Sequence, residues 1–178
     1  MHRRIPRFKL FKNFSPDYVA DNIRDIDYSA LRTAGIKAIA FDVDSTIATH
    51  AAETIDKKSA DFLRSLPLPI FLATNRTGTT ANLIGAQVEA VGVVHAEGAS
   101  RKPSKSYFSK LETLSGIKMS DFVMIGDRLF TDVLGGNSSG AMTIYVKSIG
   151  KDPSYISIFR VRWLEQLVIR LLSRSAAQ

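Results

Sequence analysis

Short apolar runs, separated by longer mixed stretches, set the pattern of the chain. The runs lie at residues 36–41, 70–73, 122–125 and 141–146, and each has the length of a buried strand, while residues 93–94 begin a further short strand. The stretches between them predict helices at about residues 57–65, 78–91, 104–114 and 129–134. Strands that alternate with helices in this way are typical of a parallel sheet with helices on both faces. We therefore predict an α/β fold of the doubly wound class.

Two further stretches flank this pattern. Ser15 and Pro16 predict the start of a short helix that runs to Ile23. Residues 153–174 predict one long helix with a broad apolar face and a narrow cationic stripe. We divide the chain into a basic and aromatic segment at 1–14, a domain at 15–150 and an amphipathic helix at 151–178.

Polar residues stand where the predicted strands end. They are Asp42 and Asp44 after the first strand, Thr74 and Asn75 after the second, Lys102 in the loop after the third, and Asp127 after the fourth, with Asp132 one helical turn further on. The carboxyl ends of parallel strands meet at one edge of a sheet, so we expect these residues to line one crevice. Two acids at a buried strand end need a positive charge nearby, which predicts a divalent metal, a lysine, or both.

This set of residue types suits the transfer of a phosphoryl group. Asp42 can attack phosphorus and form an aspartyl-phosphate, and Asp44 can protonate the leaving oxygen and later deprotonate water. Lys102 and the Thr74 hydroxyl can hold the phosphate oxygens. We expect Mg²⁺ as cofactor, bound by Asp42, Asp127 and the carbonyl of Asp44. Each motif alone is weak, because acid pairs and strand-end turns are common, but the four in this order are a strong signal.

The four motifs resemble those of the haloacid dehalogenase (HAD) superfamily of phosphatases. The match covers residues 42–46, 74–75, 102–103 and 126–132. Residues 16–19, 25–27, 35–37, 101–103 and 126–137 look more narrowly like the YqeG-type branch, which is related to mitochondrial phosphatidylglycerophosphate phosphatase. The resemblance spans about residues 14–147. It implies a HAD-like Rossmannoid sheet without a large cap domain, and the roles given above.

By the same resemblance, the metal ligands are Asp42, Asp44, Asp127 and Asp132. Thr46, Thr74, Asn75, Lys102 and Arg128 are the predicted contacts of the substrate. Ser45 stands where asparagine is common and Arg128 where glutamine is common. Neither departure removes a catalytic group, but Arg76 and Arg128 can alter what the pocket binds.

Charge is concentrated at the two ends of the chain. The formal net charge is +7. Residues 1–14 hold five basic residues and no acidic one, residues 151–178 carry a net +3, and the body between them carries −1. Cations mixed with large apolar groups suit an anionic lipid surface, and a frayed basic terminus or a helix packed on the domain are the alternatives. The chain has no cysteine and no apolar run long enough to span a bilayer. We expect no secretory signal, because the basic N-terminal residues precede no apolar core, and a short Arg-rich organelle presequence is the alternative. We expect a cytoplasmic protein with peripheral attachment to the inner face of the membrane.

Three functions remain open at this point. The first is a peripheral phosphatase that converts phosphatidylglycerophosphate to phosphatidylglycerol, which explains the site, the missing cap and the basic ends together. The second is a soluble phosphatase for a sugar phosphate or nucleotide. The third is a protein that binds RNA or a ribosomal surface through its basic ends. The third leaves the acidic residues and Lys102 unexplained. The oligomeric state cannot be read from the sequence.

Overall fold

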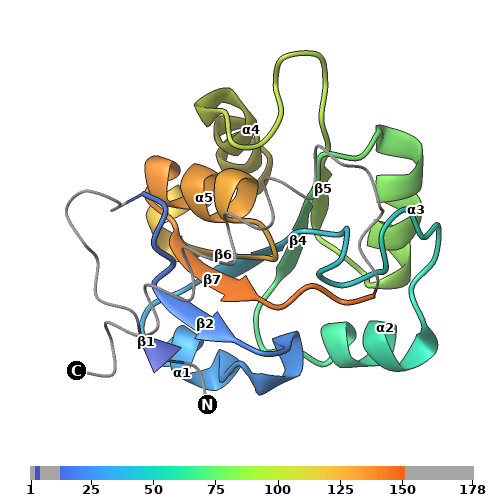
Figure 1. Cartoon of the computed structure of the whole chain (residues 1–178), viewed down its shortest axis with the longest axis horizontal. Helices are drawn as coiled ribbons and strands as arrows, with labels where there is room; N and C mark the ends of the chain where they lie inside the picture. The colour runs from blue at the N-terminus through green and yellow to red at the C-terminus, as the bar shows by residue number, and fades with distance from the viewer. Residues whose placement is uncertain (1–2, 5–12, 151–178) are drawn as a thin grey trace.

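A single sheet with helices on both sides forms the body of the protein in a computed structural model, which describes residues 3–4 and 13–150 (Figure 1). The strand order is β1-β2-β7-β6-β3-β4-β5, and every neighbouring pair is parallel except β1 with β2. The strands are β1 (Arg3–Arg4), β2 (Tyr18–Ala20), β3 (Ala38–Phe41), β4 (Ile70–Ala73), β5 (Gly92–Val94), β6 (Phe122–Gly126) and β7 (Met142–Val146). The chain winds outward from β3 in both directions, which confirms the predicted doubly wound sheet.

Helices cover both faces of this sheet. Within the described residues they are α1 (Tyr28–Thr33), α2 (Lys57–Arg64), α3 (Gly78–Gln87), α4 (Lys105–Ser115) and α5 (Leu134–Ser139). Leu63 of α2 and Ile84 of α3 belong to the same apolar cluster as Phe41 of β3. Phe108 of α4 belongs to the cluster on the other face, together with Ala40 of β3. Alternate residues of β3 therefore face opposite layers, which explains why its sequence is an unbroken apolar run.

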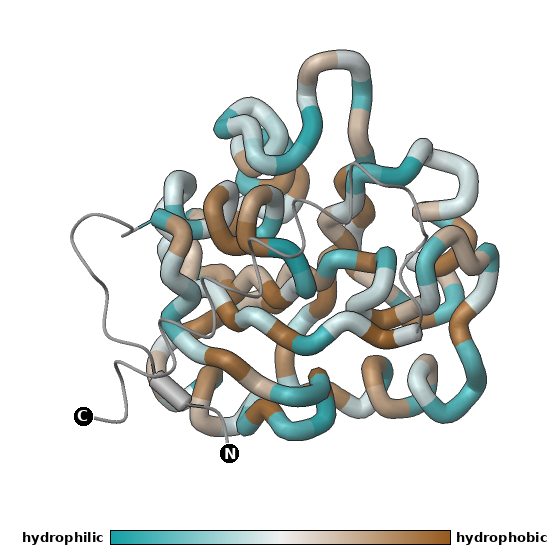
Figure 2. Tube along the Cα trace, in the orientation of Figure 1, coloured by the Kyte–Doolittle hydropathy of each residue, from teal (hydrophilic) through white to brown (hydrophobic). Residues whose placement is uncertain are grey.

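Apolar residues are concentrated in the interior strands, and polar residues dominate the outer loops (Figure 2). All residues of β3, β4 and β6 are buried. Side chains of Asp27, Asp56 and Ser104 accept hydrogen bonds from backbone N–H groups at the starts of α1, α2 and α4. These caps fix where the helices begin, because they satisfy donors that the first helical turn leaves without partners.

The predicted helix at residues 16–23 is wrong, because this stretch forms the strand β2. The backbone N–H of Asp17 donates to the Thr143 carbonyl oxygen at 2.9 Å, and its carboxylate accepts the Thr143 N–H at 2.9 Å. β2 then runs parallel to β7, with Val19 opposite Tyr145. The Ser15–Pro16 pair had the signature of a helix start, but the open edge of β7 offers a full ladder of hydrogen bonds, so tertiary pairing decides the conformation.

The predicted helix at residues 129–134 is longer and less regular than expected. A π-helical turn, η4 (Leu129–Val133), leads directly into α5, which ends at the left-handed Gly140. Gly135 and Gly136 directly follow the predicted end of the helix at residue 134, but they lie inside α5. A Cβ atom at Gly135 would overlap the ring of Phe108, so this glycine lets α5 lie close against α4. Its role is packing rather than termination of the helix.

Both ends of the described domain lie beside loops at the carboxyl edge of the sheet. The Phe14 ring packs edge-on against Phe130 of η4, with ring centroids 5.5 Å apart. The Ile149 N–H donates to the Ser45 carbonyl oxygen at 2.8 Å. The predicted helix at 153–174 and most of the segment at 1–14 lie outside the described residues. Among the helices that are described, none has the length and apolar character of a membrane span.

Candidate active site

Four acidic and basic side chains meet where β3 and β6 end. Lys102 donates from Nζ to Oδ1 of Asp42 and to Oδ1 of Asp132, both at 2.6 Å. All three side chains are buried, with Asp132 fully inaccessible to solvent. Asp127, which directly follows β6, is also buried beside them. The structure therefore brings Asp42, Lys102, Asp127 and Asp132 together from three loops that are far apart in the sequence.

Three of these residues form a group that can hold a metal ion. Asp42, Asp127 and Asp132 each offer a carboxylate oxygen, and these oxygens lie within 4.8 Å of one another. Among the described residues, Lys102 bonds directly to two of the three carboxylates, those of Asp42 and Asp132. Three buried carboxylates grouped this closely fit a divalent cation, and carboxylate oxygens are the ligands that Mg²⁺ prefers.

Burial and mutual repulsion shift the ionisation of these groups. Burial raises the pKa of Asp42 to about 6, although Lys102 opposes the shift. Burial also raises the pKa of Asp132, with Lys102 opposing and Asp127 adding to the rise. For Lys102, burial alone lowers the pKa, but the charges of Asp132 and Asp42 outweigh burial and leave it above the usual value. Asp132 and Asp42 therefore favour the charged form of Lys102, while burial favours the neutral forms of the two carboxyl groups.

Lys102 is positioned by the loop after β4 and by the start of α4. The Asn75 side chain accepts the Lys102 N–H at 2.8 Å and donates to the Lys102 carbonyl oxygen at 3.2 Å. The hydroxyl of Tyr107, in the first turn of α4, donates toward the carbonyl oxygens that end the neighbouring strands, at 3.0 Å for Thr74 and 2.6 Å for Val94. We predicted that Asn75 contacts the substrate, but its side chain is committed to the backbone of Lys102.

Asp132 is positioned by the π-helical turn and by a glycine. Its Oδ2 accepts the Arg128 N–H at 3.1 Å, which anchors the start of η4. A Cβ atom on Gly126 would overlap the Asp132 carboxyl group, so only glycine at the end of β6 leaves room for this side chain. This close approach gives a physical reason for the glycine that precedes Asp127.

The Asp44 carboxylate lies outside the group of Asp42, Asp127 and Asp132, and our prediction that Asp44 binds the metal concerns its backbone carbonyl. The two carboxylate oxygens of Asp44 accept hydrogen bonds from Arg76, at 2.8 Å from Nε and 2.7 Å from Nη2. The N–H of Ala51 also donates to Oδ1 at 2.9 Å, and Nδ1 of His50 lies 3.3 Å from the same oxygen. Burial raises the pKa of Asp44, but the hydrogen bonds from Arg76 and Ala51 outweigh it and hold the pKa below its usual value.

The predicted contacts of the phosphate lie around this centre. Oγ1 of Thr74 accepts the Arg76 N–H at 3.1 Å, so its own hydrogen remains for another acceptor. Oγ1 of Thr46 is buried with no hydrogen-bond partner among the described residues. Both hydroxyls can donate to a phosphate oxygen. Arg128 is partly buried, and its backbone N–H is the group that bonds to Asp132.

The chain matches the family model described as mitochondrial PGP phosphatase over residues 7–149. The chain belongs to this family. It is 28% identical over 168 residues to the probable phosphatase YqeG of Bacillus subtilis (strain 168), which covers 93% of this chain and 95% of that protein. It is also 26% identical over 160 residues to the chloroplastic phosphatidylglycerophosphate phosphatase 1 of Chlamydomonas reinhardtii. That alignment covers 85% of this chain and 59% of the algal protein.

The fold of this phosphatase is also seen in a solved structure. An uncharacterised protein from Corynebacterium glutamicum superposes with a TM-score of 0.51 at 16% identity, over 72% of this chain and 90% of that one. The family match and the parallel sheet confirm the predicted HAD-type branch. The protein is a HAD-superfamily phosphatase, a phosphomonoester hydrolase of the PGP phosphatase type.

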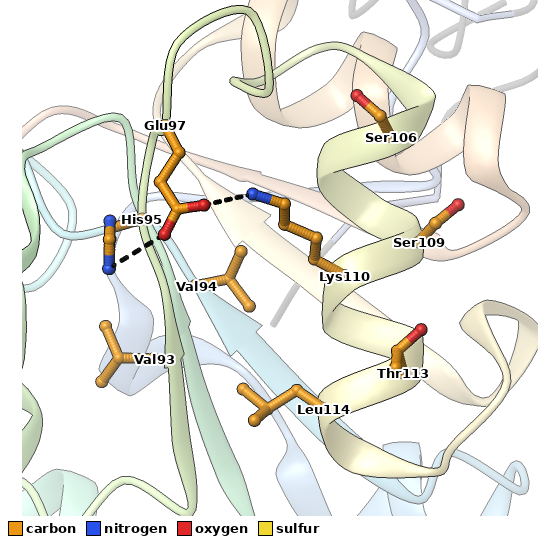
Figure 3. Close-up of a pocket in the computed structure, with 9 residues that line it drawn as sticks. All are labelled: Val93, Val94, His95, Glu97, Ser106, Ser109, Lys110, Thr113 and Leu114. Atoms are coloured by element: carbon orange, nitrogen blue, oxygen red, sulfur yellow. Dashed lines mark hydrogen bonds and ion pairs between the residues drawn. The ribbon is translucent and has the colours of Figure 1, made fainter.

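A separate hollow of about 660 Å³ lies between β5 and α4 of the phosphatase (Figure 3). Val93, Val94 and Leu114 give it apolar walls, and none of the acidic residues of the active site lines it. Glu97 at its mouth accepts a hydrogen bond from Lys110 at 2.6 Å. This exposed pair ties the loop that leads to Lys102 onto the side of α4.

Two residues near the active site were not assigned roles from the sequence. Arg76 was noted only as a residue that can alter the pocket, and its pairing with Asp44 was not predicted. Tyr107 was not singled out, although it joins the ends of β4 and β5. Arg76 directly follows Thr74 and Asn75 at the same sheet edge, so its position in the sequence already indicated closeness to Asp44.

Proposed function

We propose that this chain is a Mg²⁺-dependent phosphatase that works through an aspartyl-phosphate on Asp42, and that its substrate is phosphatidylglycerophosphate at a membrane surface. The observation that carries the chemistry is the buried group of Asp42, Asp127 and Asp132 around Lys102. Family membership supports the substrate, because the algal relative is named for this activity.

The reaction begins with attack by Asp42. Lys102 bonds to Oδ1 of Asp42, so we assign the attack on phosphorus to Oδ2. The new bond joins Oδ2 to phosphorus, the bond from phosphorus to the glycerol oxygen breaks, and Asp44 delivers a proton to that leaving oxygen. Lys102 and the hydroxyls of Thr46 and Thr74 hold the other phosphate oxygens as their charge develops.

The second half of the reaction returns Asp42 to its free form. Asp44, now ionised, takes a proton from water, the water oxygen attacks phosphorus, and the bond to Asp42 breaks to release inorganic phosphate. Asp42, Asp127 and Asp132 would hold the Mg²⁺ ion, with the Asp44 carbonyl as a further predicted ligand. When bound, the ion supplies positive charge that lets an anionic nucleophile meet an anionic phosphate.

We propose that the membrane surface lies at the catalytic edge of the sheet. The Phe14 ring packs against Phe130 of η4, and the Ile149 N–H donates to Ser45 in the loop after β3. The basic segments at 1–14 and 151–178 therefore join the domain beside catalytic loops. Basic residues near an anionic leaflet contribute about 1 kcal/mol each, enough for weak attachment in combination. Between β3 and α4 the described chain forms only α2, β4, α3 and β5, so these residues include no large cap domain, which supports a substrate as large as a lipid head group.

Phosphate release from phosphatidylglycerophosphate in mixed micelles with Mg²⁺ tests this proposal. We expect turnover by the wild type, none by Asp42→Asn, and reduced turnover by a chain that lacks residues 1–14. A panel of soluble monoesters, including a sugar phosphate and a nucleotide, is run beside it. Faster turnover of the soluble compounds would replace the lipid with the second function considered above. Failure to sediment with anionic vesicles even at low salt would remove the membrane surface from the proposal.

A further inference from the structure

Arg76 holds the side chain that the mechanism requires as its acid and base. Its Nε and Nη2 atoms bond to both oxygens of Asp44 in a bidentate pair, which is the strongest common arrangement of these two groups. The pair is largely buried, with 9% of the Arg76 side chain and 18% of the Asp44 side chain exposed. Asp44 is therefore paired with Arg76, while Asp42 is paired with Lys102.

This arrangement is unsuitable for proton transfer as it stands. An acid that protonates a leaving oxygen must turn one carboxyl oxygen toward it and carry a proton there. In Asp44, each oxygen already accepts a hydrogen bond from the guanidinium, and Oδ1 accepts another from Ala51. For the reaction to proceed, Arg76 must give up at least one of these bonds and find another anion.

The proposed substrate carries a suitable anion. In phosphatidylglycerophosphate, a glycerol unit separates the terminal phosphate monoester from a phosphodiester. Asp44 is two residues from Asp42, a separation of roughly 7 Å in extended backbone, which is comparable to the span of a glycerol between two phosphates. The planar guanidinium of arginine matches a phosphate as well as it matches a carboxylate.

We propose that Arg76 selects substrates with a second anionic group, by exchanging its ion pair with Asp44 for one with the phosphodiester and so freeing Asp44 for proton transfer. This inference rests on the proposed phosphatase function. Arg76 is then a residue that contacts substrate and positions Asp44. After the exchange, Ala51 and His50 remain beside the Asp44 carboxylate and keep it at the site.

A purely structural role for Arg76 is the competing explanation. Arg76 also donates to the carbonyl oxygens of Ala52 and Thr49, so it fastens the loop after β3 to the loop after β4. If Arg76 only holds these two loops together, its replacement should lower kcat/KM by the same factor for every substrate. A residue that selects a second anion affects only the substrates that carry one, and this difference separates the two explanations.

The test compares two soluble substrates that differ in the diester. Glycerol 3-phosphate carries only the monoester, and glycerophosphoglycerol phosphate, the deacylated head group, carries both groups. For the wild type we expect kcat/KM for the second compound to exceed that for the first by at least about tenfold. Arg76→Gln should bring this ratio near one, mainly through a higher KM for the diester compound. Arg76→Lys should keep part of the preference, because lysine retains the positive charge but cannot form the bidentate hydrogen bonds of a guanidinium.

Arg64→Gln is the matched control. Arg64 of α2 also pairs with an aspartate, Asp61, and donates to a backbone carbonyl, that of Gln87 at 2.8 Å, but it lies outside the active site. This variant should leave the substrate ratio unchanged. Equal losses on both substrates in Arg76→Gln, or a wild type with no preference, would overturn the inference.

A binding measurement separates this inference from the phosphatase proposal. The Asp42→Asn protein is titrated calorimetrically with each compound in the presence of Mg²⁺, with and without Arg76→Gln. Tighter binding of the diester compound that disappears with Arg76→Gln supports the inference, and binding that ignores Arg76 refutes it. Absence of phosphate release by the wild type from both compounds and from the lipid would reject the phosphatase proposal alone.

Discussion

Replacing Lys102 with methionine should destabilise the protein in a way that depends on pH and on metal. Methionine has a similar volume and shape, so the change removes a charge without opening a large cavity. Lys102 bonds to Asp42 and Asp132 at 2.6 Å, and all three residues are at most 5% exposed. Removing one partner from a buried charged group costs about 3–5 kcal/mol, because the remaining charges stay buried without compensation.

The loss should be largest at pH 8 in EDTA, where the carboxylates are ionised. It should shrink at pH 5, because the pKa of Asp42 is already about 6 with Lys102 present and rises further without it. Mg²⁺ should restore part of the stability, since it supplies positive charge to the same group. Urea unfolding measures the effect: with a slope of about 2 kcal/mol per molar, the midpoint falls by about 2 M.

Lys110→Met is the control for this experiment. Lys110 pairs with Glu97 on the surface, where the two side chains are 41% and 60% exposed, so the change should cost less than about 1 kcal/mol. Our reasoning would be refuted if Lys102→Met unfolds at the wild-type midpoint at pH 8 in EDTA. An equal loss at pH 5 and pH 8 would assign the effect to packing rather than to charge.

Three further results are expected. Gly126→Ala should weaken Mg²⁺ binding by at least about tenfold in calorimetric titration, because the added Cβ displaces the Asp132 carboxylate; unchanged affinity would remove Asp132 from the metal site. Folding raises the pKa of Asp42 to about 6, so in EDTA the folded protein binds more protons than the unfolded chain between pH 4 and pH 6. The free energy of unfolding should therefore fall by up to about 3 kcal/mol as pH rises through this window. Thermal melts should show this fall in the wild type and a flatter profile in Asp42→Asn. Asp44→Asn should lower kcat by about 10²–10⁴ on glycerophosphoglycerol phosphate and far less on p-nitrophenyl phosphate, whose leaving group needs no proton; equal losses would contradict the acid role.

The local patterns that predicted the sheet correctly were those that tertiary contacts do not compete with. Buried runs such as 38–41 and 122–126 form strands because no other element buries so many apolar residues in so few positions. Because these strands alternate with helices along the chain, the connections favour a parallel sheet, and the carboxyl ends of its strands meet at one edge. The family match over residues 7–149 includes the motifs at that edge.

The wrong predictions concern segments whose local sequence favours one conformation while contacts with distant residues stabilise another. Ser15 and Pro16 favour a helix, yet Asp17 and the residues after it pair with β7, about 125 residues away. Gly135 favours the end of a helix, yet it lies inside α5 because Phe108 of α4 needs the space of its missing side chain. Neither partner can be identified by reading the neighbouring sequence.

The sequence by itself determined which chemical groups are available for catalysis and at which edge of the sheet they lie. Strand length, apolar runs and acidic residues at strand ends are local properties of the chain. Only the tertiary structure decided how those groups pair. It directs Asp42 to Lys102, Asp44 to Arg76 and Asn75 to the backbone of Lys102. The direction of a side chain depends on the hydrogen-bond partners and the excluded volume that distant segments contribute. The spacing of motifs along the chain does not reveal which distant residues these are.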